Sequence, residues 1–115
     1  MEQAKVAKHF AILRDTEEKC LLWARQVGVS THRLESVATF EDWDESAHIW
    51  VFFPTDEDLQ AQKQSGFTQL LQTKYRELLS GAGYDFESFP HLSFGFDSDQ
   101  NVQENFEGSY FYRVR

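Results

Sequence analysis

The sequence predicts an α+β fold: an antiparallel sheet of about four strands with two helices on one face, in the order α-β-β-α-β-β. Three observations support this: two segments space their apolar residues as a helix does, two pairs of segments are rich in β-branched and aromatic residues, and no repeat or linker interrupts them. A length of 115 residues fits one ordinary domain, so residues 1–115 are expected to fold as a single domain. With 41% hydrophobic residues, the chain has enough apolar side chains for a core despite its net charge of -8.

The first helix is predicted from about residue 3 to 27, because apolar residues recur there three and four positions apart, and Gly28 ends it. These residues are Val6, Phe10, Leu13, Cys20, Ala24 and Val27. A competing signal is Asp15-Thr16-Glu17-Glu18, an N-cap pattern that would leave residues 6–13 as a strand ahead of a shorter helix. We prefer the single helix, since only one turn, at Glu17, lacks an apolar residue.

The middle of the chain predicts a hairpin and then a second helix. Residues 34–40 and 47–53 have strand composition, and Pro54 stops the second strand. Thr55 is a good N-cap, and the acids after it suit the positive end of a helix. Gly66 lies inside the predicted helix, where it favours a kink or a break into two helices. The buried stripe of the helix is predicted to be Leu59, Phe67, Leu70, Leu71, Leu78 and Leu79.

A closing hairpin is predicted at the C-terminal end. Its first strand alternates apolar and small or polar residues over residues 91–96, and its second strand, residues 109–115, alternates Tyr110, Tyr112 and Val114 with other residues. A polar loop from Asp97 to about Asn105 would join them. One core is expected to hold Leu92, Phe94, Phe96, Ile49, Val51, Phe53, Leu70, Leu71 and Leu78.

The polar loop resembles a calcium-binding loop only in part. Asp97-Ser98-Asp99-Gln100-Asn101 matches the first five positions, but the sixth, which should be glycine, is Val102, and the twelfth, which should be glutamate, is Gly108. The four histidines are too scattered for a local metal motif. The sequence therefore predicts neither a metal nor another cofactor.

No motif predicts an enzyme, and no catalytic residue is assigned. His91-Leu92-Ser93 has the His-x-Ser form of two-histidine phosphoesterases, but His48-Ile49-Trp50 lacks the hydroxyl residue of a second copy. A small phosphoesterase-type hydrolase that uses His48 and His91 is kept as a third alternative. Cys20 stands among apolar residues on a helix and is expected to be a small core residue.

Charge distribution is the most informative feature. Between Leu34 and Gln62 there are many acids and no lysine or arginine, and Trp43 lies within the acidic turn. Large aromatic residues within complementary charge often anchor protein interfaces. We therefore predict a partner-binding surface that consists of Glu41, Asp42, Trp43, Asp44, Glu45, Asp56, Glu57 and Asp58. Nucleic acid is not an expected partner, because phosphate contacts need a basic surface.

The expected compartment is the cytoplasm. Cys20 is the only cysteine, which argues against disulfides and for a reducing environment. No stretch has the pattern of a signal peptide, and none is apolar over the length that spans a bilayer. We expect no membrane contact.

The order of elements, together with the stretch Leu92-Ser93-Phe94-Gly95-Phe96-Asp97-Ser98-Asp99, resembles the small acidic immunity proteins of bacterial polymorphic-toxin and contact-inhibition systems, the YezG-like group among them. The resemblance implies a cytosolic protein that neutralises a cognate toxin by binding it, without catalysis. It assigns no role to any individual residue. The alternative is a small regulatory or adaptor domain that binds another cytosolic protein, or itself, through Tyr110 to Tyr112.

Overall fold

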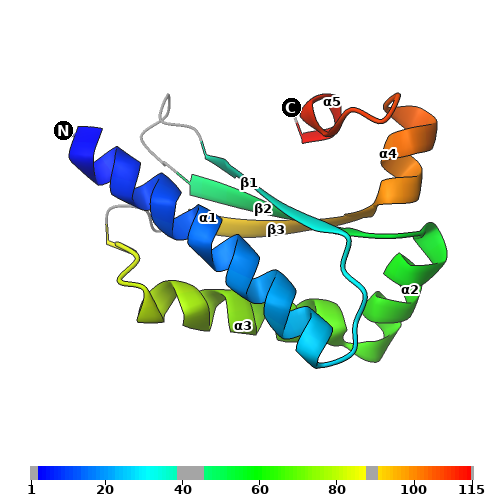
Figure 1. Cartoon of the computed structure of the whole chain (residues 1–115), viewed down its shortest axis with the longest axis horizontal. Coiled ribbons are helices and arrows are strands. Elements are labelled where there is room, and N and C mark those ends of the chain that lie inside the picture. Colours follow the sequence, from blue (N-terminus) through cyan, green and yellow to red (C-terminus); the bar gives the residue numbers. More distant parts are fainter. Residues whose placement is uncertain (1–2, 39–45, 88–90, 115) are drawn as a thin grey trace.

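The computed structural model describes residues 3–38, 46–87 and 91–114 and has an α+β fold, with helices over both faces of a three-stranded sheet (Figure 1). In chain order the described elements are α1 (Gln3–Gln26), β1 (Arg33–Ala38), β2 (Ser46–Phe53), α2 (Asp56–Ser65), α3 (Phe67–Gly81), β3 (His91–Ser98), α4 (Asp99–Asn105) and α5 (Tyr110–Val114). Helices α1 and α3 lie against one face of the sheet, and the short α5 lies over the other. No helix among the described residues is long and apolar enough to cross a membrane.

The single N-terminal helix is confirmed, and the alternative strand over residues 6–13 is wrong. Leu13, Cys20 and Ala24 are fully buried along one side of α1, as the spacing predicted. The helix ends where Gly28 adopts φ +84° and its N–H donates to the Arg25 carbonyl oxygen at 3.0 Å. A left-handed glycine satisfies the last carbonyl groups of a helix at low conformational cost, which explains the position of this end.

The first hairpin and the division of the second helix are also confirmed. β1 and β2 pair in antiparallel register, with Leu34 opposite Val51. The Thr55 hydroxyl caps α2 by accepting from the Asp58 N–H at 3.0 Å. Gly66 then takes φ +85° between α2 and α3, a conformation that breaks the helix.

Helix α3 buries most of the predicted stripe, but not Leu70. Phe67, Leu71, Tyr75 and Leu79, each four residues apart, face the core, whereas Leu70 is 54% exposed. The core position predicted for Leu70 is therefore wrong. The reason is that consecutive residues of a helix lie about 100° apart, so Leu70 projects to a different side from Leu71.

The predicted antiparallel sheet of about four strands is wrong in two respects. β3 pairs with β2 in parallel, with Ile49 opposite Phe94, so the described sheet is mixed and has the order β1-β2-β3. Parallel neighbours require a crossover connection, and α2 and α3 provide it between β2 and β3. The expected fourth strand is instead α5, which makes five helices in the described chain rather than two.

The error at the C-terminal end arises from a helix start within the predicted loop. Ser98 is an N-cap whose hydroxyl accepts from the Asn101 N–H at 3.0 Å, and Asp99 follows in the first turn of α4. Val102, in the same helix, is fully buried. A capped helix that buries Val102 therefore occupies the stretch that was predicted to be a polar hairpin loop.

The main core lies between the sheet and the pair α1 and α3. Ile49, Val51 and Phe53 are fully buried on the side of β2 that faces these helices. The remaining predicted core residues, Leu92, Phe94, Phe96 and Leu78, are half-buried against this cluster. The opposite face of β2 bears Trp50 and Phe52 and is covered by α5, which brings the end of the described chain onto the sheet.

Candidate functional site

The predicted partner-binding surface is only partly within the described residues. Glu41, Asp42, Trp43, Asp44 and Glu45 lie outside them. Asp56, Glu57 and Asp58 form the first turn of α2, just beyond the end of β2. Because β2 has eight residues and a strand rises about 3.3 Å per residue, Ser46 lies roughly 25 Å from these acids. In the sequence, Ser46 directly follows Glu45.

Two of the three acids at the start of α2 have internal partners. Asp56 accepts a hydrogen bond from the Ser98 hydroxyl, and its N–H donates to the Gln100 side chain at 3.0 Å. These bonds join α2 to the start of α4. Asp58 accepts from the Thr55 hydroxyl at 2.9 Å, which completes the cap of α2. Glu57 is exposed, so it is the residue of this turn best placed to meet a partner.

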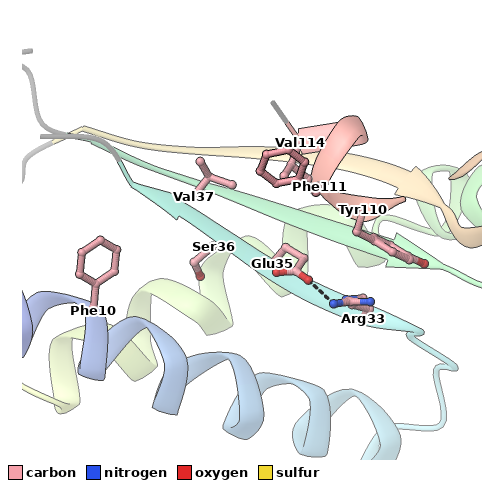
Figure 2. A pocket seen from close by; sticks show the side chains of 8 residues that line it. All are labelled: Phe10, Arg33, Glu35, Ser36, Val37, Tyr110, Phe111 and Val114. Atoms are coloured by element: carbon pink, nitrogen blue, oxygen red, sulfur yellow. Dashed lines mark ion pairs between the residues drawn. The ribbon is translucent and has the colours of Figure 1, made fainter. Parts of the chain in front are cut away.

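A groove of about 440 Å³ lies along β1, between the N-terminal half of α1 and the C-terminal helix α5 (Figure 2). One wall is Phe10 of α1, and the opposite wall comes from α5, where Phe111 and Val114 project beside Val37. Phe111 is 67% exposed, an unusual state for a phenylalanine within a groove. The groove therefore offers an apolar contact surface.

The floor of this groove is an edge strand. β1 has a strand neighbour only on the β2 side of the described sheet. Alternate residues of such a strand direct their N–H and C=O groups away from the sheet. The Ser36 N–H is one of these groups, since it donates to a Glu17 carboxylate oxygen at 3.1 Å. Glu17 thereby satisfies a backbone donor at the middle of the edge.

A second cavity of about 80 Å³ adjoins the groove and brings two carboxylates together. Glu17 and Glu35 both line it, together with Arg14. Burial raises the pKa of Glu17, and the negative charge of Glu35 raises it further, against the hydrogen bonds from Ser36 and the attraction of Arg14. Glu35 also pairs with Arg33 at 2.5 Å. A further positive charge at this place would mainly stabilise the ionised form of Glu17.

The wall formed by α5 is held by aromatic and charged contacts. The Tyr110 ring lies edge-on to Phe52 at 4.7 Å between ring centroids, and the Arg33 guanidinium lies over Tyr110 at 4.1 Å. Arg113 lies over the Trp50 ring at 4.2 Å and forms an ion pair with Asp97. These contacts attach α5 to the outer face of the sheet.

Residues of the partial calcium motif take part in this attachment. Asn101 donates to both carboxylate oxygens of Asp97, at 3.1 and 2.9 Å, and Tyr110 donates to Asp99. Burial alone would raise the pKa of Asp97, but hydrogen bonds from Arg113 and Asn101 lower it overall. Among the described residues, no three or more His, Cys, Asp or Glu side chains are grouped so that they could hold a metal ion.

The histidines of the hydrolase alternative lie on the outer face of β2 and β3. His48 is opposite Ser93 in the parallel pairing, and its Nδ1 lies 2.7 Å from the Ser93 hydroxyl oxygen. Burial, together with the positive charge of Arg113, lowers the pKa of His48. Gly95 gives the His48 ring room, because a Cβ there would be only 2.7 Å from His48 Nε2. His91 is exposed and lies opposite Ser46.

Cys20 is a core residue, as its apolar neighbours predicted. It is fully buried in α1, and burial raises the pKa of its thiol to about 12. Because a thiolate is the reactive form, Cys20 is unsuited to nucleophilic catalysis in the folded chain.

Sequence patterns did not identify the groove. Its walls come from opposite ends of the chain, Phe10 near one and Phe111 near the other, with β1 between them. The sequence feature nearest to this groove is the aromatic run from Tyr110 to Tyr112, which predicts a strand and not a groove wall.

Comparison of the chain with protein-family models, with curated proteins and with solved structures found no match.

Proposed function

We propose that this chain is a non-catalytic, cytoplasmic protein-binding domain, an immunity protein that neutralises a cognate basic toxin, such as a nuclease, through an acidic surface. The resemblance to small acidic immunity proteins supports the class of function. The net charge of -8 supports a basic partner, because opposite charge accelerates association and a like-charged partner is repelled.

The observation that carries this proposal is the acidic stretch in the middle of the chain, residues 34–62, in which no basic residue offsets the acids. The acids are Glu35, Glu41, Asp42, Asp44, Glu45, Asp56, Glu57 and Asp58, and no lysine or arginine occurs from residue 34 to 62. Glu57 is exposed at the start of α2. Trp43 would supply a large apolar contact among these charges, as central aromatic residues do in other interfaces.

The first experiment identifies the partner and tests its nature. The protein is immobilised, partners are captured from the native host, and each captured protein is expressed alone and together with this chain. We expect one basic protein that inhibits growth alone and is harmless in the presence of the chain. A partner that is acidic, or that never inhibits growth, would contradict the immunity function.

The second experiment measures binding rates with that partner at low and physiological ionic strength. Replacing Glu41, Asp42 and Glu57 with their amides should slow association about tenfold at low salt and affect dissociation less. Trp43→Ala should instead mainly speed dissociation. Glu77→Gln is the matched control, because Glu77 is an exposed acid on α3 outside the acidic stretch. An association rate that changes neither with salt nor with these amide substitutions would contradict the proposed acidic binding surface.

Two alternatives have a specific observation in their favour. Phe111 and Tyr112 are exposed on α5, at 67% and 55%, which supports a regulatory or adaptor domain that uses this helix. A captured partner with no toxicity, and with binding sensitive to Phe111→Ser, would favour that function.

The contact between His48 and Ser93 supports a hydrolase, since a neutral histidine beside a hydroxyl suits nucleophilic catalysis. Turnover of p-nitrophenyl acetate or bis-p-nitrophenyl phosphate that Ser93→Ala and His48→Gln both abolish would favour this alternative. Turnover equal to that of buffer alone would eliminate it for these two substrates.

A further inference from the structure

We propose that the groove beside β1 receives an extended segment of a basic partner protein, which adds a strand to the β1 edge and places a lysine or arginine beside Glu17 and Glu35. This inference rests on the proposed protein-binding function and deepens it, because it names a docking surface outside the predicted acidic residues and a mode of contact.

The backbone of β1 supports strand addition. The Ser36 N–H points away from β2, as its bond to Glu17 shows. Leu34 and Ala38, two positions to either side, direct their backbone groups the same way, because this direction alternates along a strand. An extended peptide would satisfy these groups through main-chain hydrogen bonds, the mode by which many peptides bind to sheet edges.

The side chains around β1 would then determine which residues the added strand carries. An added strand continues the sheet, so successive side chains would point alternately toward α5 and toward α1. Those on the α5 side would meet Phe111, Val114 and Val37, which favours apolar residues. Those on the α1 side would meet Phe10 and Glu17. The pattern expected of the partner is therefore an alternation of apolar and basic residues.

Charge argues for a basic partner over a second copy of this chain. Glu17 and Glu35 line the same small cavity, and burial and the charge of Glu35 leave the pKa of Glu17 raised, although Arg14 offsets part of this. A lysine or arginine from a partner would stabilise the charged form of Glu17, whereas Glu35 already has Arg33 as a partner. A second copy would bring another net charge of -8 to the same interface.

In the free protein, Glu17 occupies the backbone donor that a docked strand would use. Binding would exchange this bond: the partner's carbonyl oxygen accepts from the Ser36 N–H, and the released Glu17 carboxylate pairs with the partner's cation. Glu17 would thus protect the edge against unspecific pairing until a segment with a suitably placed positive charge arrives.

The experiment uses a synthetic peptide of about seven residues that alternates valine and arginine, one residue longer than β1. A control peptide has the same composition with all arginines grouped at one end. Binding is measured by fluorescence anisotropy, and the site is mapped by amide chemical shifts of the full chain. We expect shifts concentrated in β1 and α5, and affinity for the alternating peptide about tenfold higher than for the control.

Two variants test the mode of contact. Ser36→Pro removes the outward N–H without removing a bond between β1 and β2, and it should weaken binding at least about tenfold. Phe111→Ser removes the most exposed apolar side chain of the groove and should also weaken binding about tenfold. Leu70→Ser is the matched control, because Leu70 is similarly exposed on α3, outside the groove, and its replacement should leave affinity within about twofold.

Unchanged affinity in both variants, equal affinity for the two peptides, or shifts outside β1 and α5 would overturn this inference. If Ser36→Pro fails to fold, the affinity of Phe111→Ser and the map of chemical shifts alone test the proposed strand addition. The acidic-surface variants of this chain, measured with the captured partner, provide an independent result. Their effect would persist when strand addition alone fails, so the two failures are distinguishable. A dimer in sedimentation that Phe111→Ser dissociates would show that a second copy fills the groove, which also overturns the proposed occupant.

Discussion

Replacing Asp97 with alanine should release α5 from the sheet and remove one wall of the groove. Asp97 is 6% exposed and accepts hydrogen bonds from Arg113, Asn101 and the Ser98 N–H. Removing one member of a buried, hydrogen-bonded ion pair costs about 3 to 5 kcal/mol. The Arg113 side chain is 24% exposed, so water can hydrate it once Asp97 is removed. We therefore expect Asp97→Ala to lower the free energy of unfolding by about 2 to 3 kcal/mol.

A double-mutant cycle in urea measures this interaction directly. The free energy of unfolding is determined for the parent, Asp97→Ala, Arg113→Ala and the double variant, and the coupling between the two residues should be at least about 1 kcal/mol. The exposed pair Asp15 and Lys19, 2.9 Å apart on α1, provides the control and should show a coupling of only about 0.3 to 0.5 kcal/mol. Near-ultraviolet circular dichroism should also change in Asp97→Ala, because Arg113 lies over Trp50.

The pH dependence of stability has a defined sign. The pKa of Asp97 is lowered in the folded chain, so its ionised form contributes stability above the pKa of the unfolded chain. That stability is lost as the pH falls through the folded pKa, in acidic solution. The Asp97→Ala variant should lack this part of the acid transition. A coupling energy near zero, or identical acid transitions in parent and variant, would refute the assigned role of Asp97.

Three other predictions follow from buried groups. Phe53→Ala should lower the free energy of unfolding by about 3 to 5 kcal/mol in urea denaturation, because Phe53 is fully buried; a loss below about 1 kcal/mol would contradict its place in the core. The pKa of Glu17 is raised by burial, so folding is favoured while Glu17 is protonated and stability falls as the pH rises through that pKa. Glu17→Gln should flatten this fall between acidic and neutral pH, and an unchanged profile would show that Glu17 is well solvated. Cys20 should react with iodoacetamide at least about 100-fold more slowly in the folded chain than in urea, as burial and a pKa of about 12 require; equal rates would place the thiol at the surface.

Elements with strong local signals were predictable from the sequence. The apolar spacing in α1, the composition of β1 and β2, and the cap at Thr55 all act over a few residues, and the structure follows them. The break at Gly66 belongs to the same class, because one residue with a positive φ is enough to end a helix. In each case local preference and tertiary packing favour the same conformation.

Features that depend on distant parts of the chain were not predictable in this way. The direction of β3 depends on the path of α2 and α3, which no pattern within residues 91–98 encodes. Alternation over the five residues of α5 is too short to separate a strand from a helical turn. Ser98 followed by Asp99 is a local signal for a helix start, but the same residues also match part of a calcium-binding loop, so the stretch resembles a polar loop in sequence.

The candidate site was less predictable than the fold. The acidic stretch is visible in the sequence, and the bond of Asp58 to Thr55 is local to the cap of α2. The bond of Asp56 to Ser98 forms only because α2 lies beside the end of β3. The groove requires α1, β1 and α5 together, and these are separated by most of the chain. Only the fold brings their side chains to one place.

The parallel pairing of β2 and β3 also constrains how the chain acquires its structure. The contact between His48 and Ser93 spans 45 residues, whereas the ends of β1 and β2 at Ala38 and Ser46 are close in sequence, so β3 is the entropically costlier addition to the sheet. During synthesis, β2 remains the outer strand of a two-stranded ribbon until residues 91–98 leave the ribosome. Its fully buried residues Ile49, Val51 and Phe53 then belong to an open edge, the kind of surface that recruits other nascent chains. Nascent chains that end before β3 are therefore the aggregation-prone species, and protection by a chaperone matters most in that interval.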